Sequence, residues 1–146
     1  MQYFITFEHQ FSLMSNILVI DDDEIMLKTI KNILSKDGFN VFTATTGKDV
    51  HEMLQHTVYK VIITDLMLPY VNGLELVSNL RRDDVNRNVG IIVVSSLDNE
   101  ETVTEAFRLG ADDYIKKPVI AGEMLARIHK LIANINSKTQ FVTKKK

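Results

Sequence analysis

The sequence contains no cysteine, which excludes disulfide bonds and thiol chemistry. It also lacks any apolar run close to the roughly 18 residues that a membrane-spanning helix requires. The amino-terminal residues carry Glu8 and His9 in place of the basic start of a secretion signal. A net charge of −2 indicates neither a nucleic-acid partner nor any other charged one. We therefore expect a soluble, cytoplasmic protein with no membrane segment.

A chain of 146 residues is long enough for one domain with a sizeable core and leaves no room for a second. We expect this domain to span residues 16–136. Residues 1–15 precede it, and their apolar residues Phe4, Phe7, Phe11 and Met14 recur at a helical spacing of three and four. They are either an amphipathic helix that packs or self-associates, or an extension from an alternative start codon or an added sequence. Residues 137–146 are expected to be a polar, lysine-rich tail or linker.

Five short apolar runs recur along the middle of the chain, and each is too short to be a helix. They lie at residues 17–20, 41–44, 61–64, 91–94 and 114–115. Between them, apolar residues recur at helical spacing. Gly38 and Gly110 stand where helices are expected to end, and either Asp98 or Asn99 is expected to begin one.

Strands that alternate with helices predict βαβ units, whose right-handed crossovers produce a parallel sheet with helices on both faces. Burial on both faces explains why the apolar runs are continuous. We predict an α/β domain with a five-stranded parallel sheet, doubly wound as (βα)5 and flavodoxin-like. In such sheets ligands bind beyond the carboxyl ends of the strands, where the strand order reverses.

Polar side chains follow the predicted strands at that edge. Asp21 and Asp22 follow the first strand, Asp65 the third, Ser95 the fourth and Lys117 the fifth. Several carboxylates together repel one another unless a cation neutralises them, and oxygen ligands alone favour Mg²⁺ or Mn²⁺ over zinc. The sequence therefore predicts one divalent cation at this edge, with room for a phosphoryl group.

Asp65 is the candidate nucleophile, because it stands alone after the predicted central strand. Asp21 and Asp22 are neighbours and better suited to sharing a metal. A carboxylate can attack phosphorus in line while a cation and an ammonium group stabilise the phosphoryl oxygens. Ser95 offers a hydroxyl donor to the same group.

Four stretches closely resemble receiver domains of bacterial two-component response regulators. They are ILVIDDD at 17–23, DLMLPYVNG at 65–73, VVSS at 93–96 and GADDYIKKP at 110–118. Their order and spacing, including Pro69 and Gly73 four and eight residues past Asp65, make the resemblance specific. It covers about residues 16–135.

The resemblance implies that Asp65 accepts a phosphoryl group from a histidine kinase or a phosphotransfer protein. The chain would then be no enzyme beyond its own phosphorylation and dephosphorylation. The resemblance also implies that Lys117 binds the phosphoryl group, that the Lys117–Pro118 bond is cis, and that Ser95 and Tyr114 form a switch. The implied ligands of Mg²⁺ (or Mn²⁺) are Asp21, Asp22, Asp65 and the backbone carbonyl of Met67.

The output face implied by the resemblance consists of the helix after Ser95, the strand around Tyr114 and the last helix. Its mixed charges are Asp112, Asp113, Lys116 and Arg127. The subfamily that the sequence resembles dimerises through this face before binding DNA through a winged helix. No winged helix is present in this chain, so nucleic acid is expected to bind only through an output domain that the chain lacks. Met67 and Leu97 are apolar where the family places residues along the path of attacking water, which predicts slow self-dephosphorylation.

Two other functional classes remain open. Residues 21–23 contain the Asp-x-Asp pattern of haloacid-dehalogenase-type phosphatases, although Ile25 stands where that pattern needs a hydroxyl residue and no cap segment fits the length. A pseudo-receiver that only binds partners is the third class, and the intact acidic set argues against it. Taken alone, Asp21 and Asp22 are also typical of a helix amino terminus, Asp65 of a turn and Tyr114 of a core aromatic residue.

Overall fold

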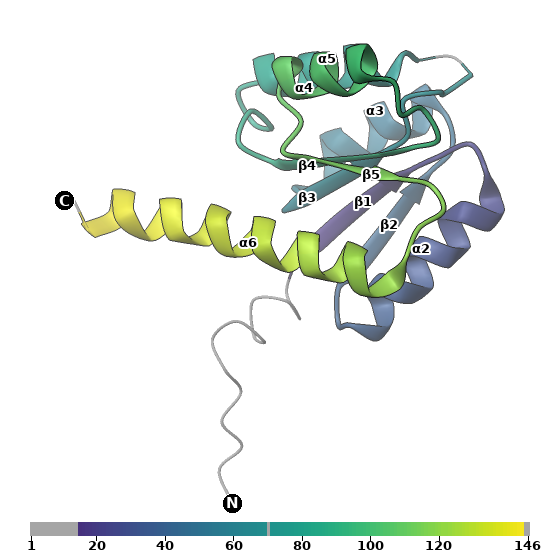
Figure 1. Cartoon of the computed structure of the whole chain (residues 1–146). Helices are drawn as coiled ribbons and strands as arrows, with labels where there is room; N and C mark the ends of the chain where they lie inside the picture. Colours follow the sequence, from purple (N-terminus) through teal and green to yellow (C-terminus); the bar gives the residue numbers. More distant parts are fainter. Residues whose placement is uncertain (1–14, 70, 145–146) are drawn as a thin grey trace, which may run out of the picture.

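Strands and helices alternate throughout the computed structural model, which describes residues 15–69 and 71–144 (Figure 1). The elements are β1 (Asn16–Ile20), α2 (Glu24–Lys36), β2 (Asn40–Ala44), α3 (Gly47–His56), β3 (Val61–Thr64), α4 (Gly73–Arg82), β4 (Gly90–Ser95), α5 (Glu100–Leu109), β5 (Asp113–Lys116) and α6 (Ala121–Lys144). The strands match the apolar runs to within a few residues.

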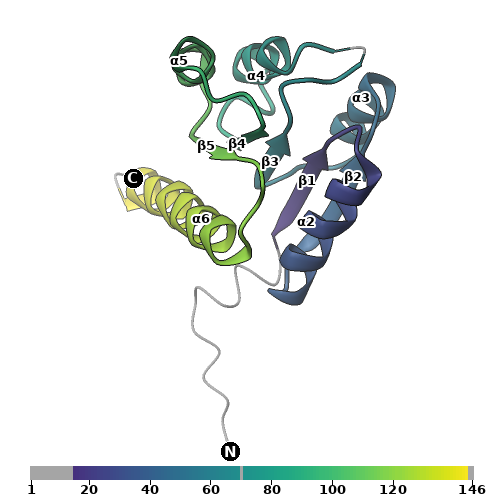
Figure 2. The same cartoon turned by 45° about the vertical axis from the view of Figure 1, so that its right-hand side comes forward.

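The five strands form one parallel sheet in the order β2-β1-β3-β4-β5. The sheet grows from β1 to β2 in one direction and from β1 to β3 in the other, so the order reverses between β1 and β3. Helices α3, α4 and α5 cover one face, and α2 and α6 cover the other (Figure 2). The predicted doubly wound fold is confirmed.

The core consists of two layers, one on each face of the sheet. Alternate residues of a strand point to opposite faces, so Leu18 and Ile62 pack toward α3, α4 and α5 while Ile17 and Ile63 pack toward α2 and α6. All four side chains are fully buried. Coverage of both faces is the physical reason for the continuous apolar runs.

The helix ends agree with the cap residues expected from the sequence. Asn99 is the N-cap of α5 and its side chain accepts a hydrogen bond from the Thr102 amide at 2.8 Å. Gly110 ends α5 with φ +120°, a conformation that favours glycine. Asp23 caps α2 in the same way, accepting from the amides of Ile25 and Met26. The N-caps Asp23 and Asn99 mark where the loops after β1 and β4 end.

The last helix is longer than expected. Its apolar periodicity ends at Ile135, but α6 continues to Lys144 and its ribbon runs beyond the sheet (Figure 1). The candidate amphipathic segment with Phe4, Phe7, Phe11 and Met14 lies outside the described residues, as do Tyr70 and the last two lysines. Within the described part of the chain, no helix has the length and apolar character needed to cross a membrane.

Candidate functional site

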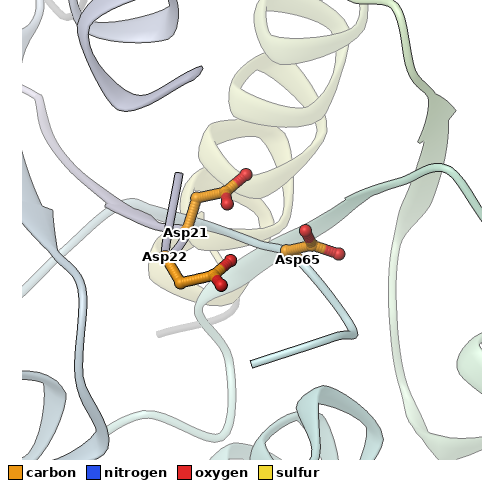
Figure 3. A group of neighbouring side chains, drawn as sticks. All are labelled: Asp21, Asp22 and Asp65. Atoms are coloured by element: carbon orange, nitrogen blue, oxygen red, sulfur yellow. The ribbon is translucent and has the colours of Figure 1, made fainter. Parts of the chain in front are cut away.

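Three carboxylates meet at the carboxyl ends of β1 and β3, where the strand order reverses. Asp21 and Asp22 follow β1, and Asp65 follows β3. One oxygen of each lies within 4.8 Å of the others, and Figure 3 shows the three side chains around a common space. Asp21 and Asp65 are buried and Asp22 is exposed. Among the described residues, no other group of three acidic, histidine or cysteine side chains comes this close.

Lys117 supplies the positive charge at this edge. Its ammonium group donates to Asp65 Oδ2 at 2.8 Å and to Asp21 Oδ2 at 2.9 Å. The residue follows β5, its amide donates to the Ser95 carbonyl at 2.9 Å, and the Lys117–Pro118 bond is cis. Burial alone would lower the pKa of Lys117, but the hydrogen bonds to Asp65 and Asp21 and their negative charges outweigh it and raise the pKa. Lys117 is therefore firmly cationic.

Two hydrogen bonds hold the Asp21 carboxylate, although burial disfavours its negative charge. Its Oδ1 accepts from the Asp23 amide at 3.0 Å, and its Oδ2 accepts from Lys117. Burial raises the pKa of Asp21, and the negative charge of Asp65 adds to this, while the two hydrogen bonds and the charge of Lys117 oppose it. The net shift is upward, so one ammonium group does not fully compensate this carboxylate.

The loop after β3 holds Asp65 from its other side. Asp65 Oδ1 accepts from the Met67 amide at 3.2 Å, and Met67 forms an isolated bridge with Asn72. Gly73 closes the loop: a Cβ there would lie 2.5 Å from the Asp65 carbonyl oxygen and from Leu66 Cα. Glycine is required by this close approach of the backbone. The Met67 side chain is 63% exposed beside the carboxylates.

Ser95 and Tyr114, the two switch candidates, form hydrogen bonds to the loop after β4. Ser95 is fully buried, and its hydroxyl accepts from the Leu97 amide at 3.2 Å. The Tyr114 hydroxyl donates to the Leu97 carbonyl at 2.5 Å, so both switch candidates bind the same residue of the loop after β4. Burial raises the pKa of Tyr114, a hydrogen bond to Ser95 lowers it, and the charges of Asp65 and Asp98 raise it further. The net shift is upward and keeps Tyr114 a hydrogen-bond donor.

The residues expected on the output face are not all brought together. Asp113 pairs with Arg127 at 3.0 Å, linking β5 to α6. Lys116 pairs at 2.6 Å with Asp98, a partner that no sequence pattern had indicated. Asp112 is separate from these pairs, because it accepts from Arg81 of α4 and from the Ile91 amide at the start of β4.

The donor set of the acidic edge suits a hard cation. It consists of carboxylate oxygens without histidine or sulfur, the ligands that Mg²⁺ prefers. Two of the three carboxylates share the single ammonium group of Lys117, so negative charge is in excess. A divalent cation would remove that excess.

The chain was then compared with known proteins. Residues 17–129 match the model of the response regulator receiver domain. The chain belongs to this family. Receiver domains are signalling domains that bind Mg²⁺ at a cluster of acidic residues, and Asp21, Asp22 and Asp65 form such a cluster here.

Similar proteins include the cell cycle transcriptional regulator CtrA of Caulobacter vibrioides, 34% identical over 128 residues, covering 88% of this chain and 54% of CtrA. The transcriptional regulatory protein SrrA of Staphylococcus aureus is 32% identical over 127 residues, covering 86% of this chain and 52% of SrrA. This receiver domain thus spans about half the length of these relatives.

Solved receiver domains have the same fold. The BeF₃-activated DrrB receiver domain is 31% identical with a TM-score of 0.75, covering 82% of this chain and 98% of that one. The receiver domain of the Francisella response regulator 1452 is 32% identical with a TM-score of 0.76, at the same coverage of 82% and 98%.

Proposed function

We propose that this receiver domain accepts a phosphoryl group on Asp65 from a histidine kinase or phosphotransfer protein. The observation that carries the proposal is the 2.8 Å contact between Asp65 Oδ2 and Lys117 Nζ, within a cluster of three carboxylates. Asp65 combines a nucleophilic oxygen with an adjacent cation. Asp22 is exposed and has no such partner among the described residues.

In the proposed step, an oxygen of Asp65 attacks the phosphorus of a phosphohistidine. The new O–P bond forms as the P–N bond breaks, and the electron pair leaves with the imidazole nitrogen, which takes up a proton. Lys117 stays protonated and moves its hydrogen bond from the carboxylate to a phosphoryl oxygen. The Met67 amide, which donates to Asp65 Oδ1, orients the carboxylate for attack.

Mg²⁺ would be held by Asp21, Asp22, Asp65 and the Met67 carbonyl, and when bound it neutralises charge on the phosphoryl oxygens. Mn²⁺ offers the same oxygen chemistry. Asp21 is suited to this role because it is buried, fixed by the Asp23 amide and not fully compensated by Lys117.

Ser95 and Tyr114 are the proposed route from the phosphoryl group to the output face. Both bind Leu97, in the loop between β4 and α5, so a movement of Ser95 toward a phosphoryl group would disturb the Tyr114 contact as well. The output face formed by α5, β5 and α6 would then change. Its proposed partners are a second copy of the domain or an output domain.

The test is brief exposure of the chain to phosphoramidate or acetyl phosphate, with Mg²⁺ or with a chelator, followed by mass mapping. We expect one phosphoryl adduct on Asp65 that requires Mg²⁺. Donor turnover that depends on Asp21 would instead support a phosphatase. The absence of any adduct would support a domain that only binds partners.

A further inference from the structure

Helices α3 and α4 lie on the face of the sheet opposite α2 and α6 (Figure 2). Residues of both helices line an apolar groove. Its volume is about 510 Å³. The apolar side chains that line it are Val50, Leu54, Leu68, Val71, Leu76, Leu80 and Val85. Val85 is 68% exposed, so within residues 15–69 and 71–144 nothing covers this end of the groove. An open apolar surface of this kind is typical of a docking site.

The chain carries an apolar segment that the receiver fold does not use. Residues 1–14 include Phe4, Phe7 and Phe11, whose spacing would place all three on one side of a helix. The same residues contain no lysine or arginine and only one acidic residue, Glu8. Such a segment gains from burial against an apolar surface more than from exposure to water.

The described chain starts close to one end of the groove. The side-chain amide of Asn16 donates to the Val58 carbonyl at 3.2 Å, and the Asn16 carbonyl accepts from the Lys60 amide at 2.8 Å. Gln55, three residues before Val58, lines the groove. The segment that precedes Ser15 is therefore tethered beside the carboxyl end of α3.

The segment is long enough to span the groove. Fourteen helical residues extend about 21 Å, whereas α3 with its 10 residues extends about 15 Å. A short tether also keeps the segment at a high local concentration, on the order of millimolar, and therefore favours docking within one chain over docking between two. The segment can reach the whole groove without leaving its own domain.

We propose that residues 1–14 form an amphipathic helix that docks Phe4, Phe7 and Phe11 into the α3–α4 groove of the same chain. The far end of the groove includes Leu68 and Val71, which belong to the loop that holds Asp65. Docking would therefore cover the back of that loop. The output face of α5, β5 and α6 lies elsewhere and stays free.

The test uses a single tryptophan, because the natural sequence has none. In Phe7→Trp, emission should be blue-shifted and severalfold less quenched by acrylamide than in a free peptide of residues 1–14 with the same substitution. The shift should persist on dilution. Adding Val85→Asp should return emission to that of the peptide, whereas Ile25→Asp, at a 78% exposed position on α2, should not. Circular dichroism checks that both variants are folded.

Peptide-like emission in the intact chain would overturn the proposal. So would a shift that disappears on dilution, which indicates a second copy as the occupant, or one that a folded Val85→Asp variant retains. A second measurement does not depend on Val85. Because the chain has no cysteine, Ser12→Cys with Gln55→Cys should form an intrachain disulfide on oxidation, and Ser12→Cys with Lys31→Cys on α2 should not. Equal cross-linking of the two pairs, or none in the first, would also refute the docking.

Discussion

Charged side chains cluster at both ends of the sheet, at the carboxyl ends of the strands and at the amino ends of β4 and β5. The two clusters differ in how their charges are neutralised. At the carboxyl ends of the strands, Asp21 and Asp65 share one ammonium group and Asp22 is left exposed. At the amino ends of β4 and β5, Arg81 pairs with Asp112 at 2.8 Å. The carboxylate cluster at the first end holds excess negative charge, whereas the Arg81–Asp112 pair at the second is balanced.

The hydrogen bonds of Arg81 make the contrast sharper. Its guanidinium donates to the carbonyls of Gly110, Arg87 and Val89 at 2.9, 3.0 and 2.6 Å, in addition to Asp112. Asp112 accepts from the Ile91 amide as well. This cluster is satisfied by the protein itself and needs no ligand, whereas the acidic edge needs a cation or a phosphoryl group. The comparison predicts that mutations at the first end affect phosphorylation and those at the second affect stability.

The largest expected effect is at the acidic edge. Asp65→Asn should abolish the phosphoryl adduct, because an amide oxygen is a poor nucleophile toward phosphorus. Asp23→Asn is the matched control: it removes a nearby carboxylate, but asparagine caps a helix about as well as aspartate. Phosphoryl transfer followed by intact-mass measurement checks both. An adduct of normal yield on Asp65→Asn would refute the assignment.

The second prediction concerns Arg81. Arg81→Met should lower the free energy of unfolding by about 3 kcal/mol, because Asp112 and three carbonyls lose their donor. Arg82→Met is its control, since that neighbour is exposed and its side chain bonds only to Ser78 among the described residues. It should cost less than about 0.5 kcal/mol. Urea unfolding measures both. Equal costs would mean that Arg81 is no more structural than an ordinary surface residue.

The third prediction concerns water attack on the phosphorylated state. Met67→Asn should shorten the phosphoryl half-life roughly fivefold, because an amide can orient water with a hydrogen bond worth about 1 kcal/mol and a thioether cannot. Loss of adduct over time by mass spectrometry gives the rate. A longer half-life in the variant than in the natural chain would contradict it.

The smallest expected effect is on the free energy of unfolding in the absence of Mg²⁺. Because the folded-state pKa of Asp21 is raised, the folded state binds a proton more tightly than the unfolded state, so this group lowers stability as pH rises through the window between the two pKa values. Without Mg²⁺, Asp21→Asn should therefore unfold at higher urea at pH 7. This gain should shrink as pH falls through the raised folded-state pKa and vanish below the unfolded-state pKa. Decreased stability at pH 7 would show that the contact with Lys117 outweighs the burial cost.

The sequence predicted the acidic edge well for a physical reason. Parallel strands place their carboxyl ends side by side, so Asp21, Asp65 and Lys117 could be brought together from strand ends alone. The Arg81 cluster could not be predicted, because most of its acceptors are backbone carbonyls and have no sequence signature. Asp112 was grouped with Asp113 for its position, yet only Asp113 lies in β5.

The full length of α6 could not be predicted from the apolar periodicity either. The apolar periodicity indicated the helix only as far as Ile135, while the helix continues to Lys144. Polar residues such as lysine and glutamine are good helix formers and can extend a helix without an apolar stripe. Periodicity marks the buried part of a helix and not its end.

The central claim is that, of the three carboxylates at the acidic edge, Asp65 accepts the phosphoryl group. Borohydride reduces an acyl phosphate to an alcohol, which converts a phosphorylated aspartate into homoserine. After phosphorylation in Mg²⁺ and reduction, peptide sequencing should find homoserine at position 65 and aspartate at 21 and 22. Homoserine at 21 or 22, or at none of the three positions, would contradict the account.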